Sequence, residues 1–148
     1  MLFRLIRLSV PFIWFGAVCA ISFMEAPLKF FAPNMTVELG LGIGRLVFHA
    51  LNYVEIVLAL LFLLSLIVTR ASDRWSAAIL PAIVFTILFL QSVWLLPALD
   101  ARTEALLSGS PPSSSHLHLA YVAAELIKVA VLLAIGILEL KPLLRKEV

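Results

Sequence analysis

The chain has 148 residues, of which 63% are hydrophobic and 14% are charged. A soluble globular domain is about half apolar and about a quarter charged, and a domain this small cannot bury so large an apolar excess. The net charge of +2 comes without a cluster of Lys and Arg on a polar face, so nucleic acid is excluded as an expected partner. The composition predicts an integral membrane protein whose main contact is the lipid bilayer.

Four apolar stretches are long enough to cross a bilayer, which takes about 20 residues of helix. Each is expected to be helical, because a spanning segment must satisfy its own backbone hydrogen bonds in hydrocarbon. In chain order they cover approximately residues 11–31, 46–69, 75–99 and 117–140. The predicted fold is an all-α, four-helix antiparallel transmembrane bundle that forms one domain over residues 1–148.

The first stretch follows Arg4 and Arg7, as the apolar core of a secretory signal peptide would. Its apolar run continues past Cys19 and Ala20 without a small-residue cleavage site, so we predict a helix that is retained. Cys19 is the single cysteine, which excludes an internal disulfide. We expect it to be a small buried apolar side chain.

Lys and Arg are distributed unevenly between the two sides of the predicted bundle. One side has Lys29, Arg45 and Arg102. The other side has Arg4, Arg7, Arg70, Arg74, Lys141, Arg145 and Lys146. Because cytoplasmic loops are enriched in Lys and Arg, we predict a bacterial inner-membrane protein with both termini in the cytoplasm.

The three connections differ in composition. Residues 33–44 carry three glycines, Gly40, Gly42 and Gly44, and are expected to form an outer loop with a short interfacial helix or a lid. Residues 70–74 are expected to form a tight cytoplasmic turn. Residues 108–115 contain Gly, Ser and a Pro pair, which predict a flexible outer linker. Pro81 is expected to kink the third helix.

Polar side chains within the spans are the most informative feature, because ionisable groups are costly in a membrane. At a rise of about 1.5 Å per residue, they fall in the outer half of the spans or near the midplane. The inner half of the spans is almost purely apolar. We therefore predict an outward-facing polar pocket above an apolar plug. It would be lined by Glu25, His49, Asn52, Gln91, His118, Tyr121, Glu125 and Lys128.

Two pairings are open for Lys128. It can pair with Glu125 three residues earlier on the same helix surface, which would make a neutral structural pair. Alternatively, Lys128 pairs with Glu55 or Glu25 on another helix. Glu125 would then be a buried acid able to donate or accept a proton.

His49, His118 and Glu125 could hold a metal through imidazole and carboxylate groups, and the two histidines could ligate a haem. No tight motif supports either, so the cofactor is left undetermined. The apolar inner half argues against a transport path. Catalysis of the serine or cysteine type is unsupported, because there is no GxSxG sequence and Cys19 has no nearby histidine.

Residues 22–30 (SFMEAPLKF) and 40–48 (GLGIGRLVF), followed by Ala50, Leu51 and Asn52, resemble a pattern of four-helix bacterial inner-membrane proteins without an assigned activity. The layout also resembles, distantly, the small four-helix membrane proteins that include anthrone-oxygenase-like members. The first resemblance covers mainly the first two helices and implies an inner-membrane location. The second concerns layout alone, and it transfers no catalytic residues.

The leading functional prediction is non-enzymatic. The protein would be a small accessory or structural membrane component that binds a partner subunit of a larger complex, a second copy of itself, a lipid or an apolar ligand. The alternative is a membrane-embedded enzyme or metal-binding protein that acts on a hydrophobic substrate at the outer leaflet. A transporter is the third possibility.

Overall fold

The computed structural model describes residues 1–69, 76–110 and 116–144. Within these ranges the chain is helical and contains no strand. The predicted turn at residues 70–74 and most of the predicted linker at 108–115 lie outside the described residues. Four described helical segments are long and apolar enough to cross a membrane, which confirms the predicted all-α bundle of four spans.

The first span is one continuous helical rod from Leu2 to Phe31. It comprises α1 (Leu2–Val18), a π-helical segment η1 (Cys19–Glu25), α2 (Ala26–Leu28) and a 3₁₀ turn η2 (Lys29–Phe31). The predicted start near residue 11 is wrong, because the helix already includes the basic N-terminal residues. Arg7 is held in this helix by the Glu139 carboxylate, 2.7 Å from its guanidinium.

The second span is the single helix α3 (Val37–Val68). Thr36 caps it, since its hydroxyl accepts a hydrogen bond from the Leu39 amide at 3.2 Å. The predicted outer lid is therefore wrong, because Gly40 and Gly44 are buried in the first turns of α3. The Phe30 ring occupies the space that a Cβ at Gly40 would need. Helix α3 has 32 residues and is therefore about 48 Å long, which exceeds the hydrocarbon core of about 30 Å.

The third span comprises α4 (Ser76–Leu90), a π-helical segment η3 (Gln91–Leu95) and α5 (Leu96–Leu107). Pro81 lies within α4, and the departure from α-helical geometry comes at η3 instead. Both π segments directly precede an α-helical segment whose second residue is a proline, Pro27 in α2 and Pro97 in α5. Proline lacks an N–H and clashes with the carbonyl four residues earlier, and a wider turn relieves that clash. The fourth span is α6 (Leu117–Leu144).

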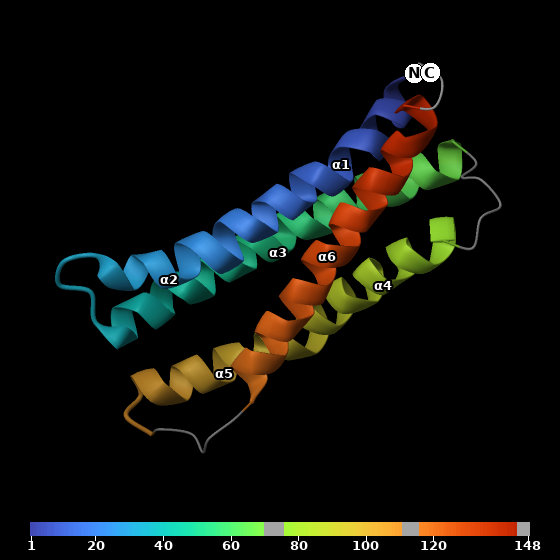
Figure 1. The fold of residues 1–148 in the computed structure, drawn as a ribbon. Coiled ribbons are helices and arrows are strands. Elements are labelled where there is room, and N and C mark those ends of the chain that lie inside the picture. Colours follow the sequence, from blue (N-terminus) through green and yellow to red (C-terminus); the bar gives the residue numbers. More distant parts are fainter. Residues whose placement is uncertain (70–75, 111–115, 145–148) are drawn as a thin grey trace.

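The helices pack as two pairs that diverge at one end (Figure 1). Helix α1 contacts α3 and α6 along most of its length, and α4 packs against α6. The beginning of α1 and the end of α6 lie together at the closed end of the bundle. The shared core lies between these helices and includes Val10, Trp14, Phe62, Leu132 and Ile135. Many other large apolar side chains point outward, as expected for a bundle surrounded by lipid.

Candidate functional site

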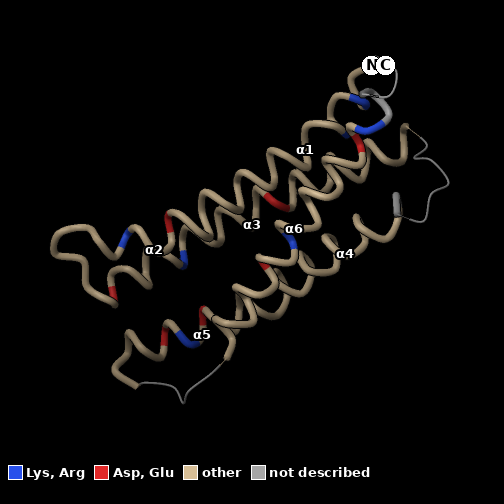
Figure 2. The backbone as a smooth tube through the Cα atoms, viewed as in Figure 1, with Lys and Arg blue, Asp and Glu red and all other residues tan. Residues whose placement is uncertain are grey.

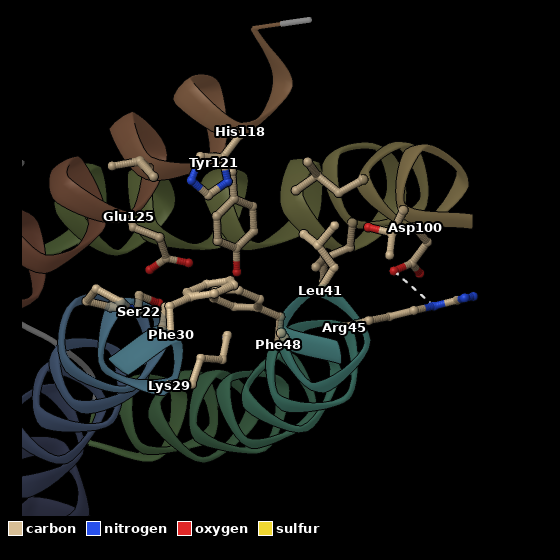
Figure 3. Close-up of a pocket in the computed structure, with 18 of the residues that line it drawn as sticks. Ser22, Lys29, Phe30, Leu41, Arg45, Phe48, Asp100, His118, Tyr121 and Glu125 are labelled. Carbon is tan, nitrogen blue, oxygen red and sulfur yellow. Dashed lines mark ion pairs between the residues drawn. The ribbon is translucent and has the colours of Figure 1, made fainter. Parts of the chain in front are cut away.

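A cavity of about 430 Å³ lies at the open end of the bundle, between the two helix pairs. One wall comes from η1, α2, η2 and the first turns of α3, and the other comes from α5 and the first turns of α6 (Figure 3). Apolar side chains supply most of the lining, among them Phe23, Phe30, Leu41, Phe48 and Val122. The polar side chains on the wall are Ser22, Lys29, Arg45, Asp100, Thr103, His118, Tyr121 and Glu125.

Glu125 forms the deep end of this cavity and is only 1% exposed. Its Oε1 accepts hydrogen bonds from the Gln91 amide at 3.0 Å and from the Lys128 ammonium at 3.1 Å. Its Oε2 is buried and has no hydrogen-bond partner among the residues that the structure describes. Tyr121, one turn earlier on α6, points its hydroxyl into the same space (Figure 3). The cavity therefore ends at a buried carboxylate with one free oxygen.

A buried polar cluster adjoins Glu125 and consists of Glu55, Gln91 and Lys128. Figure 2 shows charged positions of both signs on α3 and α6 near the middle of the bundle. The Lys128 ammonium lies 2.5 Å from Glu55 Oε1 and donates to Gln91 Oε1 at 2.7 Å. Trp14 on α1 donates its indole N–H to the same Glu55 oxygen at 2.8 Å. An ammonium has three hydrogens, and the contacts to Glu55, Gln91 and Glu125 use all three. The cluster thus ties all four spans together.

Both pairings left open for Lys128 occur at once. Lys128 contacts Glu125 on its own helix and Glu55 across the bundle. The alternative pairing with Glu25 is wrong, because Glu25 pairs with Lys29 one turn later at 3.4 Å. The Lys128 ammonium therefore forms ion pairs with two carboxylates, Glu55 and Glu125.

A second polar group lies nearer the open end. Arg45 lies 3.3 Å from Asp100 and 3.8 Å from Glu104, so α3 is joined to α5 by ion pairs. His49 donates from Nε2 to the other oxygen of Asp100 at 2.6 Å. Phe48 packs edge-on against Tyr121, with 5.4 Å between ring centroids. These contacts fix the walls of the cavity on both sides.

The predicted pocket residues separate into three locations. His118, Tyr121 and Glu125 line the cavity, whereas Gln91 and Lys128 lie in the cluster behind it. The remaining three contribute to the packing of the walls and do not line the cavity. Glu25 is paired with Lys29, and His49 is bonded to Asp100. Asn52 donates to Ser92 Oγ at 2.8 Å.

The sequence reasoning missed Trp14, Asp100 and the aromatic wall residue Phe30. Trp14 lies in an apolar run, where a packing role in the core is expected. Its indole N–H was the one feature that indicated a hydrogen bond to a polar partner. Asp100 follows the predicted end of the third span at residue 99, whereas the helix continues to Leu107. That longer helix brings Asp100 opposite His49.

The three predicted metal ligands are not brought together. Among the described residues, no group of three or more His, Cys, Asp or Glu side chains is placed to hold a metal ion. His49 is bonded to Asp100, while Glu125 is bonded to Gln91 and Lys128. The arrangement is suited to holding a polar head group at a carboxylate, with an apolar body between aromatic walls.

Comparison with known proteins gives no assignment: no family model, no curated protein and no solved structure matches the chain. The function must therefore be inferred from the site itself.

Proposed function

We propose that the protein is a small multi-pass membrane protein that binds an apolar ligand with a polar head in the cavity at the open end of the bundle. The observation that carries the proposal is the buried, unpartnered Oε2 of Glu125 at the deep end of an otherwise mainly apolar cavity. Ligand sites are typically clefts of about 300–1,000 Å³ with apolar walls and a few convergent polar groups. The cavity matches that description in size and chemistry.

The sequence left a partner subunit, a second copy, a lipid and an apolar ligand open as binding partners. The cavity favours a ligand, because it is a concave, mainly apolar space with a buried carboxylate at its deep end and not a flat surface. The lipid-facing side chains of α6, such as Leu119, Leu126 and Ile127, are apolar and exposed. They are consistent with contact to acyl chains.

We further propose an inner-membrane location with the cavity toward the periplasm. The support is the count of Lys and Arg in the sequence, which gives seven on the side predicted to hold both termini and three on the other side. An outward cavity would receive its ligand from the outer leaflet. The protein would then act as an accessory component that holds this ligand.

Filling the cavity tests the proposal. Val122 lines the cavity on α6, and Val122→Trp would place an indole in it. Leu126, one turn later on the same helix, is 55% exposed, so Leu126→Trp is a matched control that leaves the cavity unchanged. Native mass spectrometry of protein extracted in mild detergent measures the bound small molecules.

We expect one apolar molecule per chain in the wild type and in the control, and its loss in Val122→Trp. Equal retention in both variants would place the bound molecule outside the cavity. A wild-type protein that carries no such molecule, and acquires none from added lipid extract, would contradict the proposal.

A further inference from the structure

The charges in the buried cluster do not balance. Its members are two carboxylates, Glu55 and Glu125, and one ammonium, Lys128, and each is at most 1% exposed. With both carboxylates ionised the cluster carries one excess negative charge. Buried charge in a bundle within lipid is costly unless it is compensated. The missing positive charge can come from a proton on one carboxylate or from a positive group that reaches the cluster.

The cavity is the side from which that group can come. Glu55 Oε1 is already engaged by Lys128 and Trp14, and Glu125 Oε1 by Lys128 and Gln91. Among the described residues, Glu125 Oε2 is a buried acceptor without a hydrogen-bond partner, and Glu125 lines the cavity. A positive head group in the cavity would complete both the hydrogen bonding and the charge of the cluster.

The other charged residues on the cavity wall leave no excess of positive charge. The Lys29 ammonium is paired with Glu25 at 3.4 Å. The Arg45 guanidinium faces two carboxylates, Asp100 at 3.3 Å and Glu104 at 3.8 Å. An anionic head would therefore meet only cations that are already paired, while a cationic head would meet a carboxylate with one unpartnered oxygen, Glu125 Oε2.

The walls also suit a cation. Phe30, Phe48 and Tyr121 line the cavity, and aromatic faces attract ammonium groups within about 6 Å of the ring centroid. The structure already shows this contact in one instance, with the Lys29 ammonium 5.8 Å from the Phe30 centroid and 5.6 Å from that of Phe48. The Tyr121 hydroxyl lies beside Glu125 in the same space (Figure 3).

We infer that the ligand is an amphipathic organic cation, whose ammonium head donates to Glu125 Oε2 and whose apolar body lies between the aromatic walls. This inference rests on the proposed function and names its ligand class. The head would contact Glu125 and Tyr121, and the body would extend past Phe48 toward the open end.

Two isosteric probes test the charge of the head: para-butylbenzylammonium and the neutral para-butylbenzyl alcohol. Both are titrated calorimetrically at neutral pH into the full chain in nanodiscs of zwitterionic lipid, with empty nanodiscs as the blank for partitioning. A hydrogen bond to a charged partner contributes about 1.5–3 kcal/mol, so we expect the ammonium to bind at least about tenfold more tightly than the alcohol.

Two variants locate the effect. Glu125→Gln keeps the shape of the side chain and the acceptor for Lys128 and Gln91 but removes the charge, so we expect the preference for the ammonium to disappear. Glu38→Gln, at an exposed carboxylate in the first turn of α3, is the matched control and should retain it. A preference that persists in Glu125→Gln would overturn the inference.

The remaining outcomes are also decisive. If the alcohol binds as tightly as the ammonium, a proton on Glu125 balances the charge instead, and the inference fails while the cavity proposal stands. If neither probe binds, both fail. If Glu125→Gln does not fold, the charge preference of the cavity is measured on the wild-type protein by titration with para-butylbenzoate. The inference requires this carboxylate to bind more weakly than the alcohol, and equal or tighter binding would overturn it.

Discussion

Replacing Lys128 with methionine removes the ammonium from the buried cluster while keeping an unbranched side chain of similar length. Three contacts are lost, to Glu55 at 2.5 Å, Gln91 at 2.7 Å and Glu125 at 3.1 Å. Two carboxylates that are at most 1% exposed then have no ammonium between them. Breaking a buried ion pair in this way costs about 3–5 kcal/mol, and we expect the free energy of unfolding to fall by that amount.

The assay is unfolding by SDS in mixed micelles, followed by circular dichroism. Lys141→Met is the matched control, because Lys141 is exposed near the end of the same helix, and it should change stability by less than about 0.5 kcal/mol. Adding Glu55→Gln to Lys128→Met removes one of the unpaired charges. The double variant should therefore be less destabilised than the sum of the singles, by about 0.5–3 kcal/mol. Additive losses, or a Lys128→Met variant as stable as the control, would refute the reasoning.

Two further predictions concern packing and orientation. Gly136→Ala should destabilise the bundle by about 1–3 kcal/mol, because its Cβ would lie 2.6 Å from the Phe12 ring, whereas Gly42→Ala has open space and should gain up to about 1 kcal/mol from helix propensity. The same SDS titration compares them, and equal effects would contradict the described α1–α6 contact. A fluorescent protein fused to the C-terminus should be bright in cells. A phosphatase that is active only in the periplasm should be inactive when it is fused at the same position. The opposite pattern would invert the proposed topology.

The number of spans was predictable from sequence, but their ends were not. Hydropathy detects the apolar centre of each helix, and all four centres were placed correctly. The helices extend further because their ends are stabilised by contacts that hydropathy does not register. Arg7 is held by Glu139, and Thr36 caps α3 well before the apolar run begins. A glycine-rich stretch also suggested a loop, whereas Gly40 is where the Phe30 ring packs against a helix.

The sequence predicted which site residues lie together on one helix, but it did not predict the contacts between helices. Helical spacing predicts one face of the fourth span with His118, Tyr121, Glu125 and Lys128. The last three are buried on α6, whereas His118 is exposed at its beginning. Partners on other helices depend on how the helices are rotated about their axes, and the π segment at Gln91–Leu95 shifts that rotation by widening a turn. The contact between His49 and Asp100 could therefore not be derived from spacing.

The proposed binding of an amphipathic cation against Glu125 is tested most directly by photolabelling. An alkylammonium that carries a diazirine next to its head would be added to membranes containing the full chain, irradiated, and mapped by peptide mass spectrometry. We expect the label on the cavity side of α6, at Tyr121 to Glu125, and on Phe30 or Phe48 opposite. Label confined to outward-facing side chains such as Leu119 and Leu126 would contradict an amphiphile bound between the two helix pairs.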